Sequence, residues 1–118
     1  MQVSSRKEGP VLVISVEGRM DHVGASSFQS HALEKIASGT RSIVVDFGGT
    51  SFLASMGIRA LIIPSQELAK KGGRLALAGL SPELINLFQT AGLYQLFKVY
   101  PTTQDAVADG EWPQDASA

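Results

Sequence analysis

The sequence predicts a single α/β domain in which apolar strands alternate with amphipathic helices. Its 118 residues are enough for one hydrophobic core and too few for two ordinary domains. Hydrophobic residues make up 44% of the chain and charged residues 18%, a balance that favours a folded protein over a disordered one. Alternating strands and helices favour a layered sheet whose later strands run parallel through right-handed crossovers. We therefore expect a mixed β-sheet of about five strands with about four α-helices.

The N-terminal region is expected to form a β-hairpin whose first strand lies at one edge of the sheet. Val11 to Val16 is mostly apolar and β-branched, which is typical of a strand. Gly9 and Pro10 form a turn signal before it, so a strand near Gln2 to Arg6 can pair with it. The region from Gly18 to Gly24 is expected to be a turn.

A first helix is predicted after this turn, because apolar residues recur there at helical spacing. Gly39 ends the pattern, as a glycine commonly does just beyond the last helical turn. The apolar residues expected to face the core are Val23, Phe28, Ala32, Leu33, Ile36 and Ala37.

The middle of the chain predicts a buried strand followed by a second helix. Ile43 to Phe47 is a mostly apolar run, as expected of a central strand, and the glycine pair Gly48–Gly49 is expected to end it. After a loop from Thr50 to Leu53, apolar residues return at helical spacing until Lys70 and the glycines beyond it. Pro64 lies inside this second helix, where it lacks an N–H and crowds the preceding turn, so we expect a kink or a restart there.

The C-terminal third predicts a strand, a third helix, a short last strand and a final helix. Ser81 is the expected cap of the third helix, with Pro82 at its first position and Gly92 beyond its end. The strands are expected at Leu75 to Ala78 and Phe97 to Tyr100, and the final helix from a cap at Thr102 or Thr103 to about Ala108. We assign residues 1–108 to the domain and the polar residues 109–118 to a flexible C-terminal tail. Trp112 could dock on the domain, but a single aromatic residue in such a tail is more often a passenger.

Composition argues against several classes of function. The net charge is −1 and the longest cationic cluster is Lys70 and Lys71, so a nucleic-acid partner is not expected. The chain has no cysteine, which excludes disulfides, thiolate metal sites and cysteine nucleophiles. It also lacks a run of about 18 apolar residues and an apolar leader. We therefore expect a cytoplasmic protein without direct membrane insertion.

The residues needed for catalysis are scarce. His22 and His31 do not occur in a metal-ligand spacing, and the glycines of the chain lack the spacing and lysine of a phosphate-binding loop. Asp21 and His22 are adjacent in sequence and point in different directions in most backbones, so they do not form a nucleophilic set with Ser55. We expect no catalytic residue, no metal, no cofactor and no enzymatic activity.

Ser55 is the residue of greatest functional interest, because it lies at or beside the N-cap of the second helix. A structural interpretation is that its oxygen only caps the helix. A functional interpretation is that the unpaired N–H groups and the helix dipole tolerate a phosphate on this serine. Arg59 lies one turn further along, near enough to pair with such a phosphate or with an acidic partner, although a solvated arginine fits equally well. Asp46 is expected to accept hydrogen bonds from turn N–H groups at the glycine pair that follows it.

Three segments of the chain resemble the STAS domain family. The segment DFGGTSFLASMGIRALI is similar to the signature of that family, in which a strand is followed by Phe-Leu/Met-Asp-Ser-Ser-Gly-Leu and a helix. GRMDH, from Gly18 to His22, resembles its Gly-x-Leu-Asp turn, and GGRLALAGLSPELINLFQTAGLYQLFKVY resembles its third helix with the flanking strands. The resemblance extends from about Val3 to Ala108 and implies a STAS-like fold.

Within this family the chain is most similar to free-standing anti-sigma factor antagonists. The resemblance implies that it binds an anti-sigma factor with serine kinase activity and thereby releases a sigma factor. It also implies that phosphorylation of Ser55 ends this binding and that a phosphatase restores it. Two positions depart from the motif, because Ala54 replaces its aspartate and Met56 its second serine. The expected partner-binding residues are Asp21, His22, Ala54, Ser55, Met56, Gly57, Ile58 and Arg59.

Two other functions remain open on the sequence alone. STAS domains also serve in transport assemblies, so the chain fits an accessory subunit that binds the ATPase of a membrane transporter without phospho-switching. A small enzyme or nucleotide-binding module is the third alternative. The sequence is also compatible with a homodimer.

Overall fold

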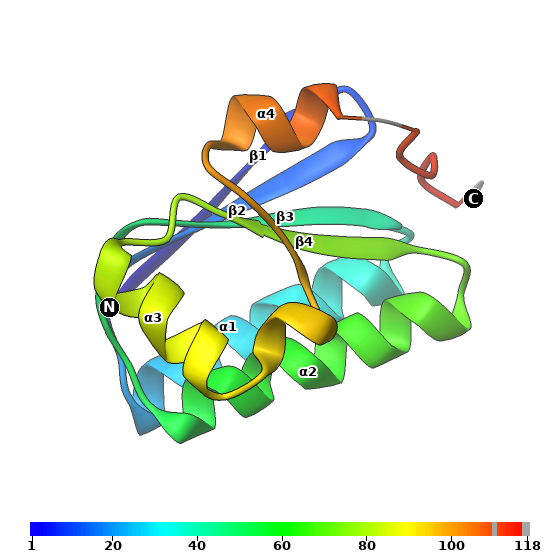
Figure 1. Ribbon diagram of the computed structural model, residues 1–118. Coiled ribbons are helices and arrows are strands. Elements are labelled where there is room, and N and C mark those ends of the chain that lie inside the picture. The colour runs from blue at the N-terminus through cyan, green and yellow to red at the C-terminus, as the bar shows by residue number, and fades with distance from the viewer. Residues whose placement is uncertain (110, 117–118) are drawn as a thin grey trace.

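In the part of the chain that the structure describes, five strands form one mixed sheet, and four α-helices cover its two faces (Figure 1). The computed structural model describes residues 1–109 and 111–116. Strand order in the sheet follows chain order, from β1 at one edge to β5 at the other. The elements are β1 (Gln2–Glu8), β2 (Val11–Met20), α1 (His22–Ala37), β3 (Ser42–Leu53), α2 (Ser55–Lys70), β4 (Arg74–Ala78), α3 (Pro82–Thr90), a 3-10 turn (Leu93–Gln95), β5 (Lys98–Tyr100) and α4 (Thr103–Ala108).

The N-terminal hairpin and the parallel crossovers confirm the predicted topology. Strands β1 and β2 pair antiparallel from Gln2 opposite Glu17 to Glu8 opposite Val11. Gly9, in the turn between them, has a φ of 62°, a conformation that glycine adopts at little cost. All later neighbours, from β2 to β5, pair in parallel.

Strands β2 and β3 both continue beyond the points where the sequence predicts their ends. Strand β2 runs through Gly18 to Met20, so the turn predicted from Gly18 to Gly24 shrinks to Asp21. Strand β3 likewise runs through Gly48–Gly49 and the predicted loop, to Leu53. The two strands stay paired through two register shifts, which absorb the irregularity that the glycines introduce.

Side-chain contacts explain why the glycine pair does not end β3. The carboxylate of Asp46 accepts a hydrogen bond of 2.8 Å from the N–H of Gly48, as predicted. A Cβ on Gly49 would lie 2.9 Å from Cγ of Glu17, so any other residue here would force the Glu17 side chain to move. Directly after Gly49, the hydroxyl of Thr50 donates a hydrogen bond of 2.8 Å to the carbonyl of Val16 in β2.

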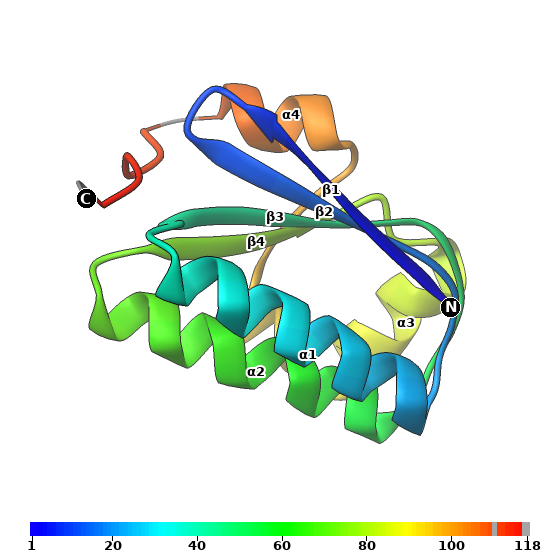
Figure 2. The same ribbon diagram turned by 180° about the vertical axis from the view of Figure 1, so that it is seen from behind.

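Helices α1 and α2 lie side by side on one face of the sheet together with α3, and α4 lies on the opposite face (Figures 1 and 2). Helix α2 continues without a restart through Pro64, which is buried. Val23, predicted to face the core, is instead 74% exposed, because it lies on the solvent side of the first turn of α1.

The C-terminal third follows the predicted caps. The hydroxyl of Ser81 accepts a hydrogen bond from the N–H of Leu84 at 3.3 Å, and that of Thr102 accepts from Asp105 at 3.1 Å. Gly92 follows α3 with a φ of 71°, and Leu93 beyond it is buried.

The sheet buries apolar side chains on both faces. On the α1–α3 side the largest fully buried residues include Phe28, Phe47, Phe88, Ile14 and Met20. A second, smaller core lies between the sheet and α4. Its buried members are Val11, Val13, Val44, Ala76, Ala78, Tyr100, Ala106 and Trp112.

Trp112 corrects the prediction that it is a passenger in a flexible tail. Its side chain is only 7% exposed, and its indole N–H donates 3.0 Å to the carbonyl of Ala106. The guanidinium of Arg74 lies 4.2 Å from the centroid of its ring. The sequence does not reveal this contact because the apolar surface that Trp112 covers is assembled from separate strands and α4.

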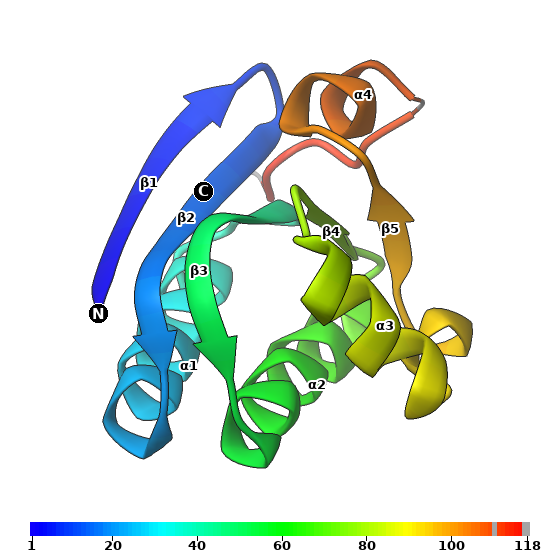
Figure 3. The ribbon, with the colours of Figure 1, turned by 60° about the vertical axis from the view of Figure 1, so that its left-hand side comes forward.

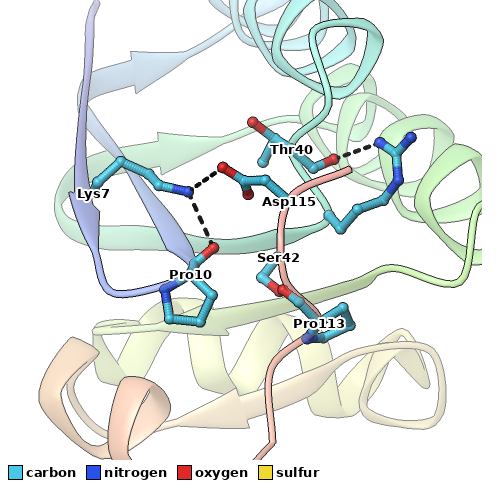
Figure 4. Close-up of polar contacts among 7 residues, drawn as sticks. Lys7, Pro10, Thr40, Ser42, Pro113 and Asp115 are labelled. Atoms are coloured by element: carbon cyan, nitrogen blue, oxygen red, sulfur yellow. Dashed lines mark hydrogen bonds and ion pairs between the residues drawn. The ribbon is translucent and has the colours of Figure 1, made fainter. Parts of the chain in front are cut away.

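The described residues after Trp112 are tied to the side of the sheet where β1 ends and β3 begins (Figure 4). The hydroxyl of Ser42 donates 2.6 Å to the carbonyl of Pro113, and the ammonium of Lys7 lies 2.7 Å from the carboxylate of Asp115. The N–H of Ala116 donates 2.8 Å to the carbonyl of Gly39. Residues 111–116 thus lie against the domain, whereas residues 110, 117 and 118 of the predicted tail are outside the described part.

Candidate functional site

The parallel pairing of β2 and β3 brings the N-termini of α1 and α2 together at one edge of the sheet (Figure 3). Met20, the last residue of β2, lies opposite Leu53, the last residue of β3. The N–H of Ala54 donates 3.3 Å to the carbonyl of Met20, which fixes the two chain exits beside each other. Asp21 and Ala54 therefore occupy equivalent places as the N-caps of neighbouring helices.

Asp21 is the N-cap of α1, and its carboxyl group has a lowered pKa. Its carboxylate accepts a hydrogen bond of 3.0 Å from the N–H of Gly24 in the first turn of α1. This hydrogen bond, aided by the positive charge of Arg19, holds the pKa of Asp21 below its usual value. The carboxylate stays ionised at neutral pH and places a negative charge on the surface.

Ser55 lies beside the cap rather than at it. It is the first residue of α2, directly after the N-cap Ala54, and it is exposed. The side chain of Ala54 has no oxygen with which to cap the helix, so the first N–H groups of α2 receive no hydrogen bond from that side chain. The hydroxyl of Ser55 is thus accessible at the positive end of a helix.

The predicted partner-binding residues contribute unequally to the apolar surface around Ser55. Met56 is 44% exposed, but Ile58 is half-buried against the core. Gly57 is buried, and a Cβ there would lie 2.5 Å from Cδ1 of Leu53. Gly57 therefore lets α2 pack closely on the strands, and neither it nor Ile58 provides a prominent exposed side chain.

Phe52 and Arg19 also belong to this surface, although no sequence pattern singles them out. Phe52 is 38% exposed near the end of β3, and the guanidinium of Arg19 lies 4.1 Å from its ring centroid. They are partners in the β2–β3 register. The sequence predicts a loop at Phe52, and a loop gives no strand register from which to expect its contact with Arg19.

A groove of about 290 Å³ opens between α1 and α2 beside this surface. His22 and Arg59, both predicted site residues, lie on opposite walls of it. The other lining residues are Ala25, Ser26, Gln29 and Ser30 from α1, and Met56 and Ile63 from α2.

The structure brings the predicted site residues to one edge but gives them no arrangement typical of a metal centre. Across residues 1–109 and 111–116, no three potential ligands of the histidine, cysteine and carboxylate classes lie close enough to hold an ion. His31 lies further along α1 with Nε2 buried. Over the same residues, no helix has both the length and the hydropathy to traverse a bilayer.

The family model that matches the chain is that of the STAS domain, over residues 2–106. BtrV of Bordetella bronchiseptica, a candidate anti-sigma factor antagonist, is 23% identical over 108 residues, which cover 92% of this chain and 93% of BtrV. The anti-sigma-F factor antagonist RsfB of Mycobacterium tuberculosis is 27% identical over 99 residues, 82% of this chain and 79% of RsfB.

Solved structures share the fold. The Bacillus cell fate determinant SpoIIAA in its phosphorylated form superposes with a TM-score of 0.71 at 24% identity, covering 90% of this chain and 96% of SpoIIAA. The mixed sheet and its helices thus belong to a known fold.

Proposed function

The chain belongs to the STAS domain family, and we propose that it is an anti-sigma factor antagonist switched by phosphorylation of Ser55. In its unmodified form it binds an anti-sigma factor that is also a serine kinase, and a sigma factor is released. The kinase transfers the γ-phosphoryl group of ATP to Oγ of Ser55, with release of ADP and a proton. A phosphatase hydrolyses the phosphoserine and restores binding.

The observation that carries this proposal is the exposure of Ser55 at the edge where two helices begin. A kinase needs a hydroxyl that it can reach, and an added phosphate at this position meets no acidic residue in the first turn of α2. The names of the relatives support the same role, because RsfB antagonises an anti-sigma factor and SpoIIAA has a phosphorylated form.

The surface around Ser55 suits reversible protein binding. Met56 and Phe52 provide exposed apolar area, and Arg19 and Asp21 provide charged groups at its margin. An apolar centre with a polar rim is typical of protein interfaces. We propose that the partner covers this surface, with Asp21 offering an ionised carboxylate to a cation of the partner.

Phosphorylation opposes this binding through desolvation. A phosphoserine adds a charge of about −1.5 to −2 at neutral pH. An uncompensated charge buried in an interface costs several kcal/mol, and about 1.4 kcal/mol is a tenfold change in affinity. One phosphate on Ser55 is therefore enough to end association. The protein itself acts by binding, and the kinase and the phosphatase supply the chemistry.

The test is phosphorylation with a purified partner kinase. The protein is incubated with the anti-sigma factor kinase and ATP, and the modified residue is located by mass spectrometry. We expect one phosphoryl group on Ser55 and none in Ser55→Ala. Ser4, an exposed serine on β1, provides the matched control, because Ser4→Ala should leave the stoichiometry unchanged. Absence of modification at Ser55 contradicts the proposal. So does copurification with a transporter ATPase that binds Ser55→Asp and the unsubstituted protein with equal affinity.

A further inference from the structure

Arg59 is placed to act on the same side of α2 as Ser55. The two residues are separated by four positions, which puts them on one face of a helix, and both are exposed. Arg59 also lines the groove between α1 and α2, opposite His22. Its guanidinium is thus within reach of a group on Ser55 and of a side chain that enters the groove.

The residues that line the groove include no carboxylate that could pair with Arg59. His22 and Arg59 are the only ionisable residues among those that line it. In the described part of the chain, no carboxylate lies within ion-pair distance of Arg59. Glu67, two turns further along α2, lies 3.8 Å from Lys70 and 4.0 Å from Lys71 instead.

Asp21, the acidic N-cap of the neighbouring helix α1, does not form an ion pair with Arg59. Asp21 precedes His22 and accepts the N–H of Gly24, and Arg19, not Arg59, is among the groups that lower its pKa. The groove therefore presents an unpaired guanidinium among uncharged polar side chains, Ser26, Gln29 and Ser30. Such a guanidinium is complementary to a carboxylate, which it can bind through two parallel hydrogen bonds.

We propose that Arg59 binds an acidic side chain of the partner in this groove while Ser55 is unmodified, and that a phosphate on Ser55 withdraws Arg59 from that role. The first half rests on the proposed function, since it requires the partner. Phosphorylation then acts twice, because it adds a dianion to the interface and removes the cation that the partner uses.

The geometry favours the phosphate in this competition. An anion four residues before a cation on a helix is the more stabilising order of the pair, and this is the order of Ser55 and Arg59. The phosphate is attached to the same chain as Arg59, so their pairing is intramolecular, whereas the partner's carboxylate must arrive from solution. The phosphate also offers three acceptor oxygens to the guanidinium.

The intramolecular half is tested without a partner or a kinase. Phosphoserine is installed at position 55 during synthesis, and the pH midpoint of its phosphate is followed by phosphorus NMR. In Arg59→Gln we expect this midpoint to rise by about half a pH unit, because the cation that favours the dianion is lost. Arg6→Gln is the matched control, since Arg6 is exposed on β1 and pairs with Glu8. Equal midpoints in the unsubstituted protein and Arg59→Gln overturn the proposal.

The intermolecular half is tested with the purified anti-sigma factor kinase. Arg59→Gln should weaken its binding to the unmodified protein by about tenfold or more, whereas Arg6→Gln should not. If the kinase binds Arg59→Gln and the unsubstituted protein with the same affinity, Arg59 does not bind an acidic side chain of the partner, and this half of the proposal is overturned. If the kinase does not bind the unsubstituted protein at all, the proposed function fails, and with it the partner half. The phosphorus NMR result still decides whether Arg59 holds the phosphate.

Discussion

Asp21 gives the site a titratable feature that can be measured without a partner. The N–H of Gly24 lowers its pKa below 3.8, so folding favours its ionised form. The stability that this provides is complete above the unfolded pKa and is lost as pH falls through the lower folded pKa. Asp21→Asn keeps an oxygen for the cap but has no charge to titrate.

We therefore expect the thermal midpoint of the unsubstituted protein to fall more steeply than that of Asp21→Asn as the pH is lowered from about 5 to about 3. Calorimetry at a series of pH values measures both curves. Two curves that stay parallel throughout this range would show that the cap is not formed by an ionised Asp21.

The positions of individual candidate residues were predictable where a local signal marked them. Ser55 follows from a helix start, and the bond from Gly48 to Asp46 follows from the need of a carboxylate in an apolar strand. Phe52 and Arg19 were not predictable, because their contact depends on the register between two strands. Val23 fitted a helical pattern, but its exposure is set by where α1 meets the sheet.

At the scale of elements, the ends of strands were harder to predict than the starts of helices. Caps such as Ser81 and Thr102 are local and gave correct helix starts. The ends of β2 and β3 are decided by pairing between the two strands, which overrides the local tendency of glycine to interrupt a strand. The extension of both strands matters for the site, because it carries Met20 and Leu53 to the edge where α1 and α2 begin.

The C-terminal segment is an element whose contribution can be measured. Trp112 fills the second core, so Trp112→Ala should lower the free energy of unfolding by about 3–5 kcal/mol. Urea denaturation followed by circular dichroism measures the loss, since Trp112 is the only tryptophan in the chain and its fluorescence disappears with it.

Glu111 is the matched control, because it is the exposed neighbour of Trp112. Glu111→Ala should change the free energy of unfolding by less than about 0.5 kcal/mol. An unfolding midpoint in Trp112→Ala equal to that of the unsubstituted protein would mean that the segment does not pack on the sheet in solution.

At the scale of the whole molecule, the alternation of strands and helices was sufficient to predict the mixed sheet with its parallel centre. The second core was not predictable, since it joins residues from β2, β3, β4, β5, α4 and the C-terminal segment. The C-terminal segment and the surface around Ser55 lie at opposite ends of β3. Ser42, which bonds to Pro113, begins β3, whereas Ser55 follows its end. The fold thus separates the segment that closes the second core from the surface proposed to bind a partner.

The most direct measurement of the central claim compares the affinity of the purified anti-sigma factor for two forms of the protein, one with serine and one with phosphoserine at position 55. We predict that the unmodified form and Ser55→Ala bind with similar affinity. The phosphoserine form should bind at least about a hundredfold more weakly, because its dianion must be desolvated. Equal affinities of the serine and phosphoserine forms would contradict the account.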